Sequence, residues 1–254
     1  MLVMERYEKI VQLVNERGSI RVSELSELCS VTEETIRRDL DRLEQAGRLK
    51  RSHGGAVSVK EQQTEVPHTE REIAYIEEKK RIAAEAVQHI GPRERIILDA
   101  STTAWYMASI LPDIPLTVLT NSIQVAIALS TKERVEVIST GGTLAPRSLS
   151  YVGPLAERSL ESYHVDKAFI SCKGIHLERG ISETNEQQAI IKSRMIGMAE
   201  QVFLLADHSK FGLKTFAHVA DLSKVHTIIT DDQIDEAFYK SLRELNVHVQ
   251  IASK

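Results

Sequence analysis

The sequence has little of what several classes of protein depend on. It contains two cysteines, Cys29 and Cys172, far apart and with no CxxC pair, so neither a disulfide framework nor a cysteine-based zinc site is expected. No apolar stretch approaches the roughly 18 residues that cross a membrane. The N-terminus becomes charged at Glu5, too early for a secretory signal. We therefore expect a soluble, cytoplasmic protein with no membrane partner, no bound metal and no cofactor.

What is present is a globular composition with an uneven distribution of charge. Of the 254 residues, 42% are apolar and 27% are charged, which suits one large domain or a small domain and a medium one. The net charge is −4, yet residues 36–60 hold seven basic and three acidic side chains. A charged stretch is commonly just a solvated face, so this local excess needs a geometric argument beside it.

Three helical segments are predicted before residue 47. Residues 3–14 carry apolar side chains at spacings of three and four, and Gly18 ends that pattern. The same spacing recurs over residues 22–28. Thr32 is then a plausible N-cap for a third helix that runs to about Ala46.

The third segment has one apolar face and one polar face. Ile36, Leu40 and Leu43 fall within about 60° of one another at 100° per residue, so the intervening charged residues project to the far side. Residues 48–57 follow as two short strands about a basic, glycine-containing tip. Three helices and such a hairpin predict a winged helix-turn-helix over residues 1–58, with its third helix in the DNA major groove.

The motifs of this region resemble those of the DeoR family of bacterial transcriptional regulators. Three parts occur in order: Val22-Ser23-Glu24-Leu25, Thr35-Ile36-Arg37-Arg38-Asp39-Leu40 and His53-Gly54-Gly55-Ala56. The resemblance implies that double-stranded operator DNA is the partner. The residues expected to contact it, in the third helix and the wing, are Thr32, Thr35, Arg37, Arg38, Arg42, Lys50, Arg51 and His53.

Several of these residues have a simpler interpretation. Arg37 could pair with Glu33 or Asp41, although an exposed helical pair contributes only about 0.3–0.5 kcal/mol. Thr35 could be an ordinary helix residue and His53 an ordinary turn residue. Because a domain with so small a basic excess binds DNA weakly by itself, we expect a homo-oligomer, a dimer or tetramer, whose domains engage two half-sites.

A linker is predicted at residues 59–70, which are polar, interrupted by Pro67 and without periodicity. Residues 71–254 open with a helical pattern from Ile73 to Ile90 and then alternate apolar runs with helical stretches. The apolar runs are residues 96–98, 116–119, 135–138, 168–170, 202–205, 227–229 and 247–249. The helical stretches include residues 102–111, 122–130, 185–199 and 234–245. This alternation predicts an α/β domain with a mainly parallel sheet that binds ligands at the carboxyl ends of its strands.

Polar loops follow three of the predicted strands. They are Asp99-Ala100-Ser101-Thr102-Thr103, which opens directly into a helix, then Asn121-Ser122, and then Gly141-Gly142-Thr143. Backbone N–H groups at a helix start, together with hydroxyls, form an anion site, although Ser and Thr also cap helices that bind nothing. Three such loops at one edge favour a phosphate-bearing ligand.

This region resembles the C-terminal sensor domain of the DeoR family, which is related in fold to ribose-5-phosphate isomerase and the CoA transferases. Further matching stretches are Thr120-Asn121-Ser122, Gly141-Gly142-Thr143-Leu144, Lys173-Gly174-Ile175 and Asp207-His208-Ser209-Lys210-Phe211-Gly212. Ala100 replaces the glycine of the family's usual Asp-Gly-Ser-Thr-Thr loop, so the backbone there must avoid a positive φ.

The resemblance implies a sugar-phosphate effector. The residues expected to bind it are Asp99, Ser101, Thr102, Thr103, Asn121, Gly141, Gly142, Lys173, Glu183 and Lys192. Lys173 and Lys192 would supply positive charge, and Glu183 or Glu186 would accept sugar hydroxyls. Lys192 could instead be a solvated helix residue, and Lys210 could simply pair with Asp207.

We therefore expect a transcriptional regulator, a repressor of a sugar-catabolism operon that a phosphorylated sugar releases from its operator. The direction of regulation stays open, because the ligand could instead activate the regulator. The alternative in kind is a sugar-phosphate isomerase-like enzyme with an appended DNA-binding domain. The isomerase's acidic strand-end motif, Asp-Gly-Ala-Asp-Glu, is replaced here by Ser171-Cys172-Lys173-Gly174, which lacks the carboxylate that such chemistry needs, so no catalytic residue is expected.

Overall fold

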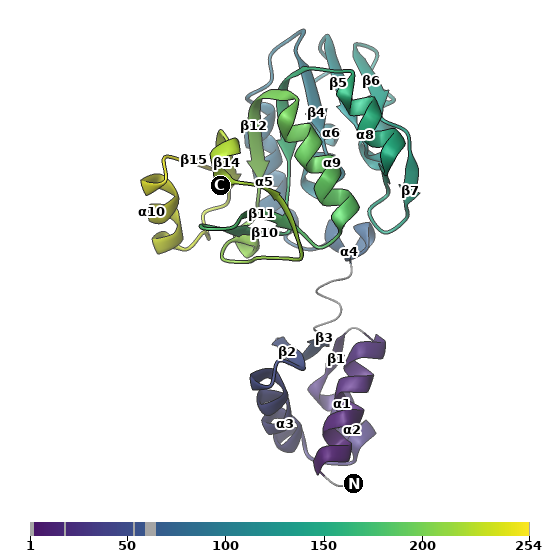
Figure 1. The fold of residues 1–254 in the computed structure, drawn as a ribbon, viewed down its shortest axis with the longest axis vertical. Coiled ribbons are helices and arrows are strands. Elements are labelled where there is room, and N and C mark those ends of the chain that lie inside the picture. Colours follow the sequence, from purple (N-terminus) through teal and green to yellow (C-terminus); the bar gives the residue numbers. More distant parts are fainter. Residues whose placement is uncertain (1–2, 18, 53, 59–64, 254) are drawn as a thin grey trace. The chain divides into compact units, whose positions relative to one another are not determined.

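The protein folds into two compact units, Met1–Glu65 and Val66–Lys254, drawn in Figure 1. The computed structural model describes residues 3–17, 19–52, 54–58 and 65–253. The hydrophobic core of the first unit is separate from the two cores of the second. The two units are therefore described one after the other.

The first unit contains three helices, α1 (Val3–Arg17), α2 (Val22–Cys29) and α3 (Glu33–Gln45), which confirms the three predicted segments. The stop predicted at Gly18 lies outside the described residues. The apolar stripes of the three helices meet in one core, whose fully buried side chains include Ile10, Val14, Leu25, Ile36 and Leu40. Thr32 caps α3 as predicted, because its hydroxyl accepts a hydrogen bond from the Thr35 N–H at 3.3 Å.

A three-stranded antiparallel sheet completes the first unit. Its strands β1 (Ser19–Arg21), β3 (Gly55–Ser58) and β2 (Leu49–Ser52) pair in that order, and β2 with β3 forms the predicted wing. Gly55 permits the close approach of β3 to β1, since a Cβ at this position would lie 2.2 Å from the Ile20 carbonyl oxygen. Three helices and a hairpin therefore give the predicted winged helix-turn-helix.

The second unit begins earlier than predicted. Residues 66–70, assigned to the linker by their polar composition, pack as part of this unit. His68 is only 2% exposed, and its N–H donates to the Arg147 carbonyl at 2.7 Å. Composition alone missed this because a single buried residue, His68, anchors a segment that has no apolar periodicity.

The helix predicted for residues 73–90 forms over a shorter range, and a short helix that was not predicted precedes it. The structure has two helices, α4 (His68–Glu72) and α5 (Ile76–Val87). The break lies at Tyr75, whose φ of 54° is in the left-handed region and does not continue a right-handed helix. This turn lets α4 and α5 point in different directions while staying close together.

The centre of the second unit is a seven-stranded sheet in the order β15-β14-β12-β9-β4-β5-β6, with every neighbouring pair parallel. Its strands along the chain are β4 (Arg95–Leu98), β5 (Leu116–Thr120), β6 (Val135–Ser139), β9 (Val165–Ile170), β12 (Ala199–Leu205), β14 (Thr227–Thr230) and β15 (His248–Ile251). Each predicted apolar run overlaps one of these strands. The predicted mainly parallel α/β domain is confirmed.

Helices cover both faces of this sheet, which explains its continuous apolar strands. The helices not yet given are α6 (Thr102–Ile110), α7 (Ile123–Leu129), α8 (Pro154–Glu161), α9 (Glu186–Gly197) and α10 (Glu236–Glu244). One core contains buried side chains of α5, α6 and α7, and the other contains those of α8, α9 and α10. Figure 1 shows α9 in front of the sheet and α6 behind it.

The strand order reverses between β4 and β9. The chain lays down β4, β5 and β6 in one direction and then returns to place β9 on the other side of β4. In parallel α/β sheets, ligands bind outside the carboxyl ends of the strands at such a reversal. The fold therefore predicts a ligand site where the loops after β4 and β9 meet.

Several small elements were not predicted. They are β7 (Thr143–Ala145) paired with β8 (Ser150–Val152), helix α8, the small sheet of β10 (Gly174–His176), β11 (Gly180–Glu183) and β13 (Ala217–Ala220), and the 3₁₀ turns η2 (His208–Lys210) and η3 (Leu222–Lys224). Strands of three or four residues are too short to display an alternating pattern.

Candidate functional site

The outward face of α3 carries the arginines that the sequence singled out. Ile36 and Leu40 are fully buried in the core, whereas Arg37 and Arg38 are 49% and 75% exposed at their side chains. Thr32 and Arg42 also lie at the surface, and Thr35 is half-buried. Lys50 and Arg51 on β2 are exposed as well, while His53 lies outside the described residues.

These arginines are held by local, exposed partners. Arg37 bonds Glu33 at 2.6 Å and Arg38 contacts Glu34 at 3.4 Å, as expected for side chains one helical turn apart. Arg51 pairs with Asp41 at 2.5 Å, joining the wing to α3. Exposed pairs of this kind are weak, so they leave the arginine side chains available for other contacts at little cost.

A buried ion pair fixes α3 against α1. Asp39 is 3% exposed, and its carboxylate accepts hydrogen bonds from the Arg6 guanidinium at 2.5 and 3.2 Å. Asp39 lies within the motif that carries the resemblance, yet its partner lies 33 positions earlier. The only sign of that pairing in the sequence is an acidic residue on an otherwise apolar helix face.

In the second unit, the loops after successive parallel strands meet at one edge of the sheet. Asp99 follows β4, Asn121 follows β5, Gly141 follows β6, Lys173 follows β9 and Asp207 follows β12. The structure therefore brings the predicted effector residues to the same edge. Asp99 and Lys173 flank the reversal of strand order.

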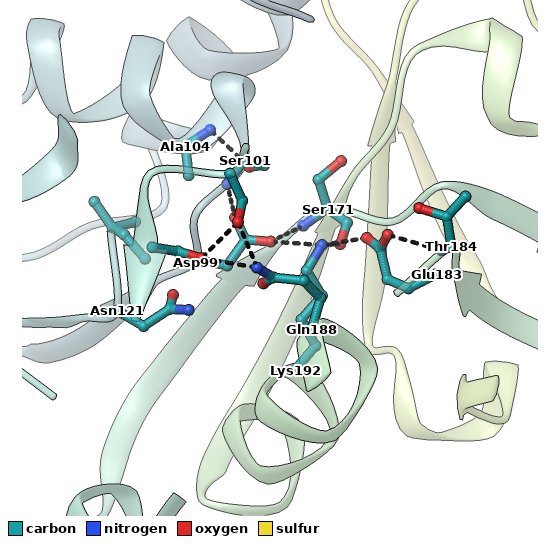
Figure 2. Close-up of polar contacts among 12 residues, drawn as sticks. Asp99, Ser101, Ala104, Asn121, Ser171, Glu183, Thr184, Gln188 and Lys192 are labelled. Atoms are coloured by element: carbon teal, nitrogen blue, oxygen red, sulfur yellow. Dashed lines mark hydrogen bonds and ion pairs between the residues drawn. The ribbon is translucent and has the colours of Figure 1, made fainter. Parts of the chain in front are cut away.

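Asp99 is fully buried and acts as a bridge across this reversal (Figure 2). Its carboxylate accepts hydrogen bonds from the Ser101 N–H at 3.0 Å and from the Ser171 N–H at 2.9 Å. The Lys192 ammonium lies 3.2 Å from the same carboxylate. Asp99 thus ties the loop after β4 to the loop after β9 and to α9.

Lys192 is engaged by three partners, as Figure 2 shows. Besides Asp99, it contacts the Glu183 carboxylate at 2.5 Å and donates to the Ser171 carbonyl at 2.6 Å. Burial by itself would lower the pKa of Lys192, but the two carboxylates outweigh that effect and raise it. Three residues that we expected to bind an effector independently therefore bind one another, and the positive charge of Lys192 is already compensated by two carboxylates.

The remaining predicted loops have a mixture of roles. Ser101 caps α6, because its hydroxyl accepts from the Ala104 N–H at 3.1 Å, and Thr102 and Thr103 are buried in the first turn. Ala100 has no positive φ, as its side chain requires. Asn121 donates to the Tyr151 carbonyl at 3.0 Å, but its own amide oxygen is buried with no hydrogen-bond partner.

The two glycines after β6 differ. Gly141 has a φ of 61° and open space around it. Gly142 has a φ of 120°, and a Cβ there would lie 2.8 Å from the Val152 carbonyl oxygen and 3.0 Å from the Ala156 side chain. Gly142 therefore serves the packing of α8 against this loop, and Gly141 alone is free to approach a ligand.

Lys173 belongs to a basic cluster that the sequence did not predict as a group. The cluster consists of Arg71 on α4, Lys79 on α5, Lys173 after β9 and Lys210 on η2. Burial and the charges of Lys210 and Arg71 lower the pKa of Lys173 to about 8, against the opposing effects of Glu183 and Asp207. Burial and the charges of Lys210, Arg71 and Lys173 likewise lower the pKa of Lys79 to about 8, against Asp207.

Direct contacts also join the elements of this cluster. The Lys79 ammonium donates to the Arg71 carbonyl, and Lys210 lies 3.6 Å from Asp207. The Tyr75 ring, between α4 and α5, packs edge-on against the His208 ring of η2 with centroids 5.3 Å apart. These contacts place α4, α5 and η2 side by side at the carboxyl edge of the sheet.

One signal in the sequence pointed to Lys79. It shares the buried stripe of α5 with Ile82, Ala83 and Ala86, and it is only 5% exposed. A lysine on an apolar helix face is unusual because burying its charge is costly without a partner. Arg71 carried no such signal, because it lies at the polar start of the predicted sensor domain, outside any apolar pattern.

Three further observations concern the described residues. Cys29 and Cys172 are buried and unpaired. No described helix is both long and apolar enough to cross a membrane. Within the same part of the chain, no three His, Cys, Asp or Glu side chains are grouped so that they could hold a metal ion.

Comparison with known proteins identifies both units. The model for the DeoR-like helix-turn-helix domain matches residues 6–62, and the model for the DeoR C terminal sensor domain matches residues 74–232. Among solved structures, ribose 5-phosphate isomerase A from Methanocaldococcus jannaschii aligns with a TM-score of 0.39 at 16% identity, covering 52% of this chain and 53% of that one.

Similar proteins cover nearly the whole chain. The HTH-type transcriptional regulator YulB of Bacillus subtilis (strain 168) is 57% identical over 98% of this chain and 96% of its own length. The L-fucose operon activator of Haemophilus influenzae is 40% identical over 92% of this chain and 94% of its own length. The HTH-type transcriptional repressor GlcR of Bacillus subtilis is 36% identical over 98% of this chain and 96% of its own length. Matches of this extent, together with the two family models, mean that the chain belongs to the DeoR family of DNA-binding transcriptional regulators.

Proposed function

We propose that this regulator represses a sugar-catabolism operon and that a phosphorylated sugar releases it from its operator. The observation that carries the DNA-binding half is the exposed face of α3, where Arg37 and Arg38 have only weak local partners. Arginine recognises phosphate and guanine in a two-pronged geometry. Thr32, Thr35 and Arg42 on or beside α3, with Lys50, Arg51 and His53 of the wing, complete the proposed DNA contacts.

The effector site of this proposal is the carboxyl edge of the parallel sheet. Helix α6 begins there with Ser101 as its N-cap, and a helix N-terminus favours an anion. Thr102, Thr103, Asn121 and Gly141 surround this edge. The buried amide oxygen of Asn121 has no partner and is suited to accept a hydrogen bond from a sugar hydroxyl.

The proposed assembly is a homo-oligomer, a dimer or tetramer. A single winged helix-turn-helix makes few phosphate contacts, whereas two linked domains on two half-sites bind far more tightly through their effective concentration. Sedimentation of the protein with and without operator DNA tests this point. A monomer on DNA would contradict it.

The sign of regulation is also a proposal, because the similar proteins include an operon activator and a repressor. Release by the ligand requires that the ligand bind the DNA-free state more tightly. Couplings of this kind are typically about 1–3 kcal/mol, a 5- to 150-fold change in affinity, and are reciprocal. A sugar phosphate that tightens operator binding would reverse the proposed sign.

The test uses fluorescence anisotropy with duplexes from the control regions beside the gene for this chain, at low and moderate salt. Arg38→Ala is expected to weaken operator binding at least tenfold, whereas Lys240→Ala, an exposed change on α10, should have no effect. Phosphorylated pentoses, hexoses and deoxyhexoses are then screened for release. Equal binding by the wild type and Arg38→Ala would refute the proposed interface, and consumption of a sugar phosphate would favour the isomerase alternative.

A further inference from the structure

Helices α6 and α7 have no charged side chain, in a chain where 27% of the residues are charged. Across residues 100–131 the only charged residue is Asp113. Every other described α-helix of the second unit carries at least three charged residues. Helix α5, which packs on the same face of the sheet, carries six. The lack of charge is therefore a property of these two helices and not of that whole face.

Helix α7 is apolar on all sides and yet lies at the surface. Six of its seven residues are apolar, with Gln124 as the exception. Val125 and Leu129 are buried against the sheet, whereas Ile127, on the opposite side of the helix, is 60% exposed. A helix that is apolar on all sides is normally covered on all sides. The outer side of α7 is therefore suited to contact with another protein surface.

The end of α6 extends this apolar surface. Helix α6 packs against α7, and its last residue, Ile110, is 51% exposed. The Asp113 carboxylate accepts hydrogen bonds from the Glu133 N–H at 3.3 Å and the Arg134 N–H at 2.9 Å, so it joins the loop after α6 to the loop after α7. The one charge of this stretch thus holds the two helix ends together. We name the α6–α7 face by its exposed and half-buried apolar residues, which are Ile110, Ile123, Ala126 and Ile127.

The rim of the α6–α7 face carries charges of both signs. Directly after α7, residues 132–136 contain two cations, Lys132 and Arg134, and two carboxylates, Glu133 and Glu136. A nucleic acid or an acidic membrane surface requires an excess of positive charge, which neither the two helices nor this rim supplies. In a two-fold interface the same patch lies on both sides, so the cations of one copy can meet the carboxylates of the other. The balance of charge therefore favours a second copy of this chain as the partner.

We propose that two copies of this chain associate through the α6–α7 face. This inference rests on the proposed function in one respect, that operator binding needs a homo-oligomer, and it adds where the copies meet. The uncharged helices form the apolar core of the interface and residues 132–136 form part of its polar rim, the arrangement found in protein interfaces. Covering Ile110 and Ile127 removes apolar surface from water, which is the main favourable contribution to association.

The experiment measures self-association of the full chain, without DNA, by analytical ultracentrifugation over a range of protein concentrations. Ile127→Glu would place a carboxylate without a partner in the interface, so the dissociation constant should rise at least tenfold. Leu155→Glu is the matched control. Leu155 is 62% exposed on α8, which packs on the other face of the sheet, and this variant should associate as the wild type does.

Thermal melting of the same samples shows whether each variant is folded. Weaker association of Ile127→Glu alone, with cooperative melting retained, supports the proposal. Unchanged association of Ile127→Glu, or equal weakening in both variants, overturns it and leaves the proposed homo-oligomer with a different interface. If Ile127→Glu does not fold, Ile110→Lys takes its place.

A wild-type chain that is monomeric at every concentration would overturn both this inference and the proposed assembly. The operator-binding test with Arg38→Ala concerns α3 in the first unit. Its outcome therefore does not depend on which surface joins the copies.

Discussion

At the scale of single residues, buried charges distinguish structural from binding roles. Arg6 with Asp39, and Lys192 with Asp99 and Glu183, are closed groups in which opposite charges meet. Arg71, Lys79, Lys173 and Lys210 are an open group with unpaired donors and lysines of lowered pKa. A buried charge is stable only when something compensates it, so the first groups hold the fold together and the second is suited to binding an anion.

Replacing Asp39 with alanine tests the closed group in the first unit. The Arg6 guanidinium would stay buried without its partner, and breaking a buried pair in this way typically costs about 3–5 kcal/mol. Urea unfolding followed by circular dichroism measures the loss. Asp41→Ala is the matched control, since it removes the exposed pair with Arg51 and should cost less than about 1 kcal/mol. Similar losses in both variants would contradict the assignment.

The open group predicts how phosphate binding depends on pH. Lys79 and Lys173, with pKa values of about 8 in the ligand-free protein, face Arg71, Lys210 and Asp207, and Lys173 also faces Glu183. Phosphate favours their charged forms and so raises both pKa values. Binding is therefore strongest below pH 8 and weakens as the pH rises through 8 to 10, where the free lysines lose their protons.

Calorimetric titrations with inorganic phosphate at pH 7.0 to 9.5 measure this dependence. The decrease in phosphate affinity per pH unit should be smaller in Lys79→Met, because this variant has one fewer proton to lose. Affinity that stays constant above pH 8 in the wild type would show that neither lysine binds the phosphate.

At the scale of elements, the loops after the parallel strands carry the chemistry, and their packing decides which residues are free. Gly142 is held between β8 and the start of α8, whereas Gly141 faces open space. Both have positive φ, so alanine is strained at either position. The additional backbone clash exists only at Gly142.

We therefore expect Gly142→Ala to destabilise the protein by about 2 kcal/mol or more and Gly141→Ala by about 1 kcal/mol. Urea unfolding of the two variants gives the comparison. The same variants separate structure from binding, because Gly141→Ala should be the one that affects affinity for a sugar phosphate at matched stability. Equal stability losses would mean that the loop has room to move away from α8.

At the scale of the whole molecule, α4 connects the basic cluster of the second unit to the segment that joins the two units. Arg71 is on α4, the first described helix after the linker. Two hydrogen bonds hold the backbone of α4 to the rest of the second unit. The His68 N–H donates to the Arg147 carbonyl, and the Tyr106 hydroxyl donates to the Glu72 carbonyl. A ligand that binds Arg71 therefore acts on the segment through which an effector signal has to pass.

Hydrogen exchange in the full chain tests this connection. Inorganic phosphate should slow amide exchange in peptides covering residues 66–75, and Lys80→Met should respond as the wild type does. In Arg71→Gln the protection should be lost. Protection at residues 99–103 with none in α4 would show that the signal takes another path.

Much of the fold follows from local pattern. The three helices of the first unit, the wing and all seven strands of the large sheet were predicted, because helical apolar spacing, continuous apolar runs and glycine positions are strong local signals. The short strands of the small sheets and the break at Tyr75 were not, because they depend on contacts with distant parts of the chain. Arg71 was missing from the predicted site for the same reason, because its place beside Lys173 and Lys210 depends on contacts between distant parts of the chain.

The sequence by itself determined the family, the order of the domains and the sheet edge at which polar residues gather, since motifs and periodicity are properties of neighbouring residues. Only the tertiary structure decided which charges are already paired. Lys192 and Lys79 are both lysines on helices, but one lies between two carboxylates and the other among cations. That difference arises from residues 8 to 131 positions away along the chain, because electrostatic energy depends on distance in space and on burial, not on order in the sequence.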